Sequence, residues 1–109
     1  MPASNVKDDF LQLPQNLTVR SIAAVQQEIL QFIDKNTSAT IEIGDDCQAD
    51  ISFIQLMEAT RIYAGTAGKH ITLAEPADGA VLDALQRGGF LEGMSEEDAK
   101  FWLHQGGMQ

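Results

Sequence analysis

Few residues in this sequence combine the types and spacing that chemistry at a site requires. The two histidines, His70 and His104, stand in no pattern that pairs a general base with a nucleophile. Cys47 is the only cysteine, and the acidic residues around it disfavour the reactive thiolate. No glycine-rich run is followed by Lys-Ser or Lys-Thr at the spacing of a phosphate-binding loop. We therefore expect no enzymatic activity, no catalytic residue and no cofactor.

An acidic loop holds the main group of potential metal ligands. Asp45, Asp46 and Asp50 offer carboxylate oxygens, but their spacing lacks the pattern of a calcium-binding loop. A solvated surface loop is the better interpretation, and we expect no metal site. The run Gly44-Asp45-Asp46 also raises the alternative of a receiver-like phospho-aspartate domain. That alternative needs a lysine at the end of a later strand, whereas Lys69 stands at the start of one.

Ser52 is the residue with the clearest regulatory potential. It stands where a strand over about 39–43 passes into a helix over about 53–64, and either Asp50 or Ser52 opens this helix. As a helix cap, the serine oxygen accepts a backbone N–H, a contact worth about 1 kcal/mol. The start of a helix also tolerates a phosphate, which adds about −1.5 to −2 charges. From the residues alone, both a plain cap and a phosphorylation site are open.

The elements that position these residues alternate between strands and helices. Apolar residues at helical spacing predict a first helix from about 18 to 35, with Thr18 as its cap and Leu17 packing on Ile22. The other predicted elements are strands over 8–13, 39–43 and 70–74, and helices over about 53–64, 76–87 and 95–105. This alternation favours an α/β fold with at least one parallel strand pair, because strand-helix-strand units cross over.

Size and charge narrow the possible partners. The 109 residues include 7 basic and 16 acidic side chains, a net charge of −9, which argues against nucleic acid and anionic membranes. A hydrophobic fraction of 44% is enough for one core in a single domain. Residues 1–7 form a polar arm without the apolar centre of a signal peptide, and no apolar run suffices to insert into a membrane. We expect a cytoplasmic protein whose partner is a neutral or basic protein surface.

A series of motifs extends over residues 8–92. It comprises the strand Ala39-Thr40-Ile41-Glu42-Ile43, the loop Asp50-Ile51-Ser52, the strand Lys69-His70-Ile71-Thr72-Leu73 and the helix Val81–Gln86 with its ending Gly88-Gly89-Phe90-Leu91. In this order the motifs resemble the STAS domain, named after sulfate transporters and anti-sigma-factor antagonists. In that family an Asp-Ser-Ser-Gly-like loop carries a regulatory phosphoserine. Asp50 and Ser52 match its aspartate and its phospho-acceptor, while Ile51 and Phe53 replace the first serine and the glycine.

The resemblance implies an architecture. We expect a small mixed sheet of about four strands with helices packed mainly on one face. The STAS-like domain covers 8–92, after the polar arm at 1–7 and before an extra C-terminal helix and tail at 93–109. That helix, with Phe101 and Trp102, either covers the sheet or contacts a partner, and the usual burial of tryptophan favours cover.

The resemblance also implies a function in bacterial signal transduction and transcription regulation. An unphosphorylated antagonist docks on an anti-sigma factor, usually a serine kinase, and phosphorylation of the motif serine, here Ser52, blocks docking. The implied docking residues are Asp50, Ser52, Phe53, Ile54, Gln55 and Glu58. The alternative is a constitutive STAS subunit without phosphorylation, bound to a histidine-kinase-like protein in a chemotaxis-type system or to a lipid-transport ATPase complex. In either case we expect a monomer or a weak homodimer.

Overall fold

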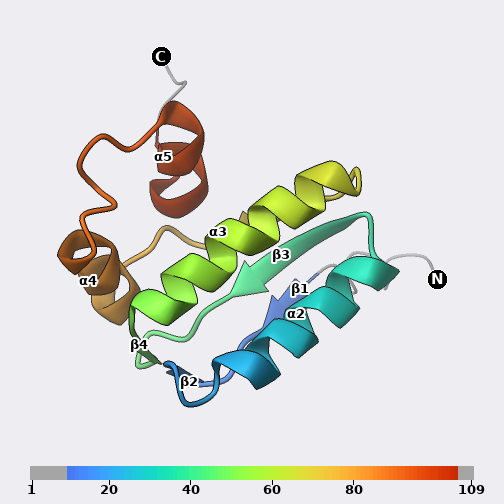
Figure 1. The fold of residues 1–109 in the computed structure, drawn as a ribbon, viewed down its shortest axis with the longest axis horizontal. Coiled ribbons are helices and arrows are strands. Elements are labelled where there is room, and N and C mark those ends of the chain that lie inside the picture. The colour runs from blue at the N-terminus through green and yellow to red at the C-terminus, as the bar shows by residue number, and fades with distance from the viewer. Residues whose placement is uncertain (1–9, 106–109) are drawn as a thin grey trace.

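Strands and helices alternate along residues 10–105, the part of the chain that the computed structural model describes. Within these residues the elements are β1 (Phe10–Gln12), β2 (Asn16–Leu17), α2 (Ile22–Lys35), β3 (Ser38–Glu42), β4 (Gln48–Ala49), α3 (Ile51–Thr66), β5 (His70–Leu73), α4 (Gly79–Arg87) and α5 (Glu96–Leu103). The expected α/β alternation is confirmed (Figure 1). The predicted arm at 1–7 lies outside the described residues, as does the end of the predicted tail at 106–109.

The central sheet contains three parallel strands in the order β1-β3-β5. Ile41 of β3 lies opposite Leu11 on one side and Leu73 on the other. The connections through α2 and α3 therefore progress in one direction across the sheet. Because such crossovers are right-handed, both helices cover the same face, as Figure 1 shows. The expected mixed sheet of about four strands is corrected here, since the described strands pair only in parallel, in one set of three and one of two.

The set of two lies at the starts of α2 and α3. β2 and β4 pair in parallel, with Leu17 opposite Ala49. Each strand has only two residues, too few for a pattern of alternating polarity, and the sequence analysis predicted neither. The pair brings two turns that are distant in the sequence next to each other, and the candidate site lies at this junction.

The first helix begins later than its apolar pattern predicts. α2 starts at Ile22, and its cap position is Ser21, whose side chain makes no capping hydrogen bond. Thr18 belongs to the preceding turn, where its backbone N–H and its hydroxyl both donate to Asn16 Oδ1, at 3.1 and 2.6 Å. Leu17 is buried as part of β2. The chain therefore forms a strand and a turn where the sequence pattern indicated a first helical turn.

The hydrophobic core lies between the sheet and its helices. Its fully buried members include Val25, Ile29 and Ile33 of α2, Phe53, Ile54 and Met57 of α3, and Ile41 of β3. Buried and less buried residues alternate along β3 and β5, so the opposite face of the sheet carries polar side chains. There the hydroxyls of Thr40 and Thr72 lie 3.5 Å apart.

The C-terminal helix α5 completes the core. Trp102 is fully buried, and its ring packs edge-on against Phe101 with the ring centroids 5.0 Å apart. The Trp102 carbonyl accepts a hydrogen bond from Ala77 N at 2.7 Å, and its Nε1 donates to Glu58 Oε2 at 2.8 Å. The helix thus covers the core and is fixed through both its backbone and a side chain.

Candidate functional site at the start of α3

Asp50 fixes the loop that precedes α3. Its Oδ1 accepts a hydrogen bond from Ser52 N at 3.0 Å, which makes Asp50 the cap of the helix. Its Oδ2 accepts from Val19 N, also at 3.0 Å. One carboxylate therefore joins the start of α3 to the turn before α2. The hydrogen bond from the Ser52 hydroxyl, followed by those from backbone N–H groups, lowers the pKa of Asp50.

Ser52 lies inside the first turn of α3 rather than at the cap position. The sequence allowed two caps for this helix, Asp50 and Ser52. In the structure Asp50 is the N-cap, so the interpretation of Ser52 as the N-cap is wrong. The partly buried Ser52 side chain donates its hydroxyl hydrogen to Asp50 Oδ1. A phosphate on this oxygen would bring about −1.5 to −2 charges beside an existing carboxylate and remove the hydrogen bond between them.

Phe53 and Ile54 lie in the core, and both side chains are 0% exposed. Each step along an α-helix turns the side chain by about 100°, so these two residues face the interior while Ile51 and Ser52 do not. In this structure neither Phe53 nor Ile54 offers surface to a partner. Of the expected docking residues, these two therefore lie beneath the surface.

Gln55 and Glu58 have different surroundings on α3. Gln55 is exposed. Glu58 is occupied, because its Oε2 accepts hydrogen bonds from Trp102 Nε1 at 2.8 Å and from Arg61 Nη1 at 3.0 Å. Arg61 also reaches Asp98 of α5 at 2.8 Å. Glu58 therefore helps to hold α5 on α3, whereas Gln55 is free to meet a partner.

An outward-facing row of residues on α3, here named the α3 stripe, was not identified from the sequence. It consists of Ile51, Gln55, Ala59, Ile62, Tyr63 and Thr66, all exposed and at helical spacing. Ile62 is 70% exposed, Ile51 43% and Tyr63 40%. The solvent side of a helix ordinarily carries charged residues, but the α3 stripe contains none.

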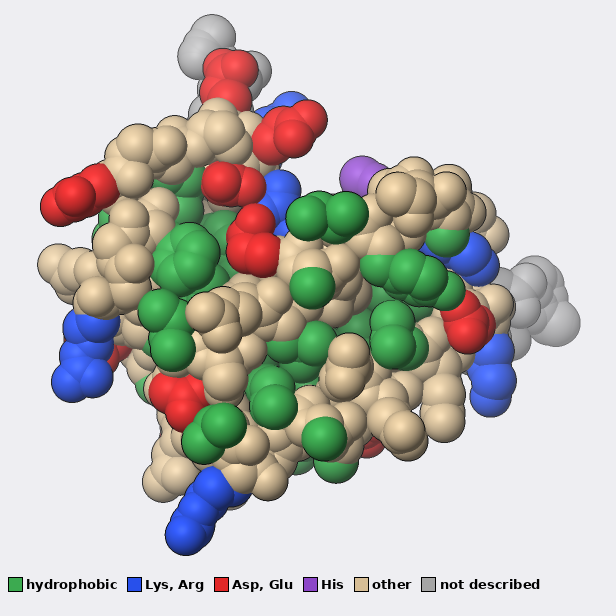
Figure 2. All heavy atoms as spheres, viewed as in Figure 1, with side chains coloured by type: hydrophobic (Ala, Val, Ile, Leu, Met, Phe, Trp, Pro, Cys, Tyr) green, Lys and Arg blue, Asp and Glu red, His purple; other side chains and the backbone are tan. Residues whose placement is uncertain are grey.

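The space-filling view shows the same property. In Figure 2 hydrophobic and uncharged side chains occupy the middle of the face that α2 and α3 present, and most charged side chains lie nearer its margin. The sequence did hold a signal for this surface. Apolar residues occur on all sides of α3, including Ile54, Ile62 and Tyr63, and a single core cannot bury every side of a helix.

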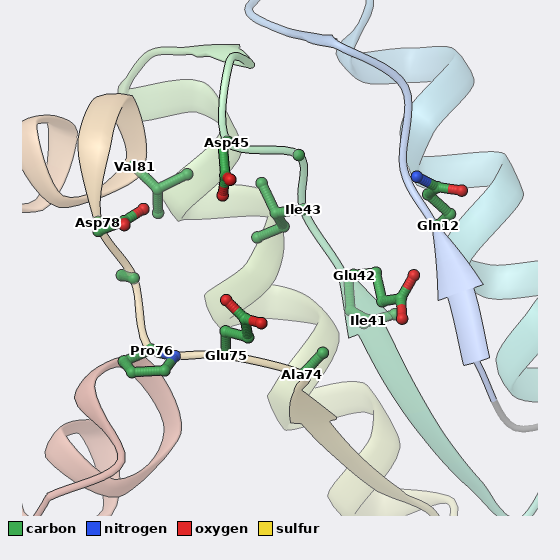
Figure 3. A pocket seen from close by; sticks show the side chains of 12 residues that line it. Gln12, Ile41, Glu42, Ile43, Asp45, Ala74, Glu75, Pro76, Asp78 and Val81 are labelled. Carbon is green, nitrogen blue, oxygen red and sulfur yellow. The ribbon is translucent and has the colours of Figure 1, made fainter.

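A cavity of about 320 Å³ lies at the carboxyl ends of β1, β3 and β5 (Figure 3). Four carboxylates line it, those of Glu42, Asp45, Glu75 and Asp78, together with apolar side chains that include Ile41, Ile43 and Val81. Ligands of open parallel sheets often bind at this edge. Among the described residues no lysine or arginine lines the cavity, so the potential of its lining disfavours phosphates and other anions. Residues 10–105 contain no group of three or more His, Cys, Asp or Glu placed to hold a metal ion.

The acidic loop spreads its carboxylates over separate places. Asp45 lines the cavity, Asp46 Oδ2 accepts a hydrogen bond from Gln15 Nε2 at 2.8 Å, and Asp50 caps α3. Cys47 is buried between them, and burial first, then the charge of Asp46, raises the pKa of its thiol. The loop thus forms no shared carboxylate site.

Comparison with protein-family models, with curated proteins and with solved structures found no match to the chain. The resemblance to the STAS domain therefore depends on the sequence motifs. Among the described residues, every helix is too short or too polar to cross a membrane.

Proposed function

We propose that this protein is a non-enzymatic regulator that binds a signalling protein through the start of α3, as an anti-sigma-factor antagonist does. The partner is a serine kinase or anti-sigma factor, and phosphorylation of Ser52 controls the complex. The observation that carries this proposal is the α3 stripe, an exposed and charge-free surface that begins beside Ser52. Protein interfaces use such surfaces, because their centres are depleted in charge and contain apolar anchors.

The position of Ser52 supports control by charge. Its neighbour Ile51 is the first residue of the stripe, and Gln55, the next residue of the stripe, follows four residues after Ile51 on the same side of the helix. A phosphate on Ser52 would put charge at the edge of an uncharged surface and repel the Asp50 carboxylate. Both effects weaken docking of a partner that contacts the stripe.

A second candidate is a constitutive interaction subunit of a chemotaxis-type signalling system or of a lipid-transport ATPase complex. One contact favours it. The Ser52 hydroxyl already has a structural partner in Asp50, which links α3 to the turn before α2. In this case the α3 stripe binds its partner at all times, and Ser52 serves only to steady Asp50.

Photo-crosslinking from the stripe tests both candidates. A photoreactive residue replaces Gln55 in cells that produce the protein, and a matched control carries it at Gln31, an exposed residue of α2. We expect Gln55, but not Gln31, to crosslink a serine kinase or anti-sigma factor. Ser52→Asp should abolish the crosslink and Ser52→Ala should keep it.

Mass spectrometry of the product decides between the outcomes. A crosslink to the same class of partner that persists in Ser52→Asp assigns the constitutive role. A crosslink to a histidine-kinase-like protein or a transporter ATPase does the same. No crosslink above the Gln31 control, or one to a metabolic enzyme, contradicts both candidates.

A further inference from the structure

The turn over residues 18–21 presents an exposed apolar side chain next to the start of α3. Val19 is 67% exposed, and its backbone N–H donates to Asp50 Oδ2 at 3.0 Å. Ile51, the first residue of the α3 stripe, follows Asp50 directly and is also exposed. The Asp50 carboxylate thus joins two segments that each carry an exposed apolar side chain.

This carboxylate is the one hydrogen-bonded tie between the turn and α3 among the described residues. The other hydrogen bonds of the turn stay within residues 16–25, such as that from the Ser21 hydroxyl to the Asn16 carbonyl at 2.5 Å. No second contact of this kind would hold the turn against α3 if the bond between Val19 and Asp50 were broken.

The other oxygen of the same carboxylate belongs to Ser52. Asp50 Oδ1 accepts both the backbone N–H of Ser52, at 3.0 Å, and its hydroxyl hydrogen. A carboxylate is planar, so its two oxygens move together. A phosphate on the partly buried Ser52 side chain removes the hydroxyl donor and adds about −1.5 to −2 charges beside Oδ1. The carboxylate relieves this repulsion by turning away, and Oδ2 then leaves the Val19 N–H.

On the basis of the function proposed above, we propose that Asp50 is a positioning residue that relays phosphorylation of Ser52 to the turn over residues 18–21. While the Ser52 hydroxyl is free, the carboxylate holds Val19 beside Ile51, and both side chains contact the signalling partner. A phosphate on Ser52 releases Val19 and takes this anchor out of the docking surface. Docking is then lost through a change of shape as well as through charge.

Arg20 strengthens the response of the turn. It follows Val19, is exposed, and has no ion pair among the described residues. A phosphate on Ser52 would attract this guanidinium while it repels the carboxylate that holds the turn. Both forces favour an arrangement of the turn that differs from the one with a free Ser52 hydroxyl.

Solvent exchange of single amides, measured by NMR, tests the relay without any partner. Protein with phosphoserine at position 52 is compared with unmodified protein. We expect the Val19 amide to exchange about fivefold or more faster in the phosphorylated form, because its acceptor is lost. The Gln48 amide is the internal reference, since it donates to the Gln15 carbonyl at 2.8 Å without Asp50 and should keep its rate. Gln31→Glu adds a negative charge on α2 and should change neither amide.

Three results overturn the relay. They are an unchanged Val19 rate in the phosphorylated protein, an equal acceleration of the Val19 and Gln48 amides, and an acceleration of the Val19 amide in Gln31→Glu. Ser52→Asp adds one charge in place of two and should produce the same change at smaller size. It serves as the second variant if phosphoserine unfolds the chain, which far-UV circular dichroism detects.

The docking role of Val19 is tested with the Gln55 crosslinker. Val19→Ala removes two exposed methyl groups and should lower the yield of the crosslinked signalling partner about fivefold or more. Phe10→Ala is the matched control, because Phe10 is an exposed apolar residue of β1, and it should leave the yield unchanged. A yield that survives Val19→Ala, or falls equally in Phe10→Ala, overturns this role.

The relay and the proposed function fail in different ways. If Gln55 crosslinks a signalling protein while phosphorylation leaves the Val19 amide unchanged, the proposed function stands and the relay is wrong. If phosphorylation releases the Val19 amide while the Gln55 crosslinker captures nothing, the relay stands as a property of the fold. The signalling function then fails, and the docking role of Val19 fails with it.

Discussion

Asp50 uses both oxygens of one carboxylate to hold together segments that lie far apart in the sequence. Oδ1 serves the first turn of α3 and Oδ2 serves Val19, in the turn before α2. Asparagine keeps the shape and one acceptor oxygen but loses the charge. Comparison of aspartate with asparagine at this position therefore isolates the contribution of the ionised carboxylate to the free energy of unfolding.

A pH-dependent stability follows from this arrangement. The pKa of Asp50 is lowered in the folded state from an ordinary 3.8, so its contribution is fully present above that value. It is lost as the pH falls through the lowered folded pKa. We expect Asp50→Asn to reduce the free energy of unfolding by about 0.5–1 kcal/mol at pH 7, and the difference from wild type to shrink below about pH 4. Urea unfolding followed by Trp102 fluorescence measures the free energy of unfolding of wild type and Asp50→Asn at each pH. If the difference between the two proteins grows as the pH falls, the stabilising role given to the Asp50 charge is wrong.

Residue-level features were the hardest to predict from the sequence. The pattern placed Ser52 and Asp50 at a helix start but left the choice of cap open, and it did not reveal the contact between Asp50 and Val19, which no local signal encodes. Phe53 and Ile62 are both large and apolar, yet one is 0% and the other 70% exposed. Only the direction in which the sheet lies distinguishes them, and that direction is a tertiary property.

At the scale of elements, Arg61 is one of the residues that attach α5 to α3, beside the buried Trp102. Its guanidinium joins Glu58 to Asp98 and lies 4.5 Å from the centroid of the Phe101 ring. These contacts occur at a side chain only 18% exposed, where solvent screens charge less than at the open surface. The pair formed by Arg87 and Asp83 is far more exposed and provides a comparison within the same chain.

Removal of the two arginines should therefore have unequal effects. We expect Arg61→Ala to lower the free energy of unfolding by about 1–2 kcal/mol, because it loses two ion pairs and a cation–π contact. Arg87→Ala should change it by less than about 0.5 kcal/mol. Chemical denaturation of both variants provides the measurement. Equal losses would mean that Arg61 does not hold α5.

The elements themselves were largely predictable, because long apolar periodicities survive tertiary context. Over residues 10–105, the four helices and the three strands of the central sheet all correspond to predicted segments. β2 and β4 were missed because two residues carry no periodicity. The start of α2 was placed too early because Leu17 is apolar at helical spacing and yet is buried as part of a strand.

At the scale of the whole molecule, an excess of negative charge acts against the compact state. The net charge is −9, and four of the carboxylates converge on the cavity at the end of the sheet. Added salt screens both this repulsion, which destabilises the fold, and the few ion pairs, which stabilise it. We expect the effect on the repulsion to be the larger one. We expect Tm to rise by a few degrees between about 10 mM and 300 mM sodium chloride, as measured by calorimetry. A fall in Tm would show that the ion pairs dominate.

The parallel sheet also sets the order in which this chain can acquire structure. Phe10 pairs with Thr40 and Ser38 with His70, so the partners stand 30 (40 − 10) and 32 (70 − 38) residues apart. Within residues 10–105, no strand pair of the sheet can close as a local hairpin, because a crossover through a helix joins the strands of each pair. On a ribosome β1, α2 and β3 emerge first and can assemble, while β5 joins later. Core substitutions in α2 should therefore slow folding, and those in α5 should mainly speed unfolding.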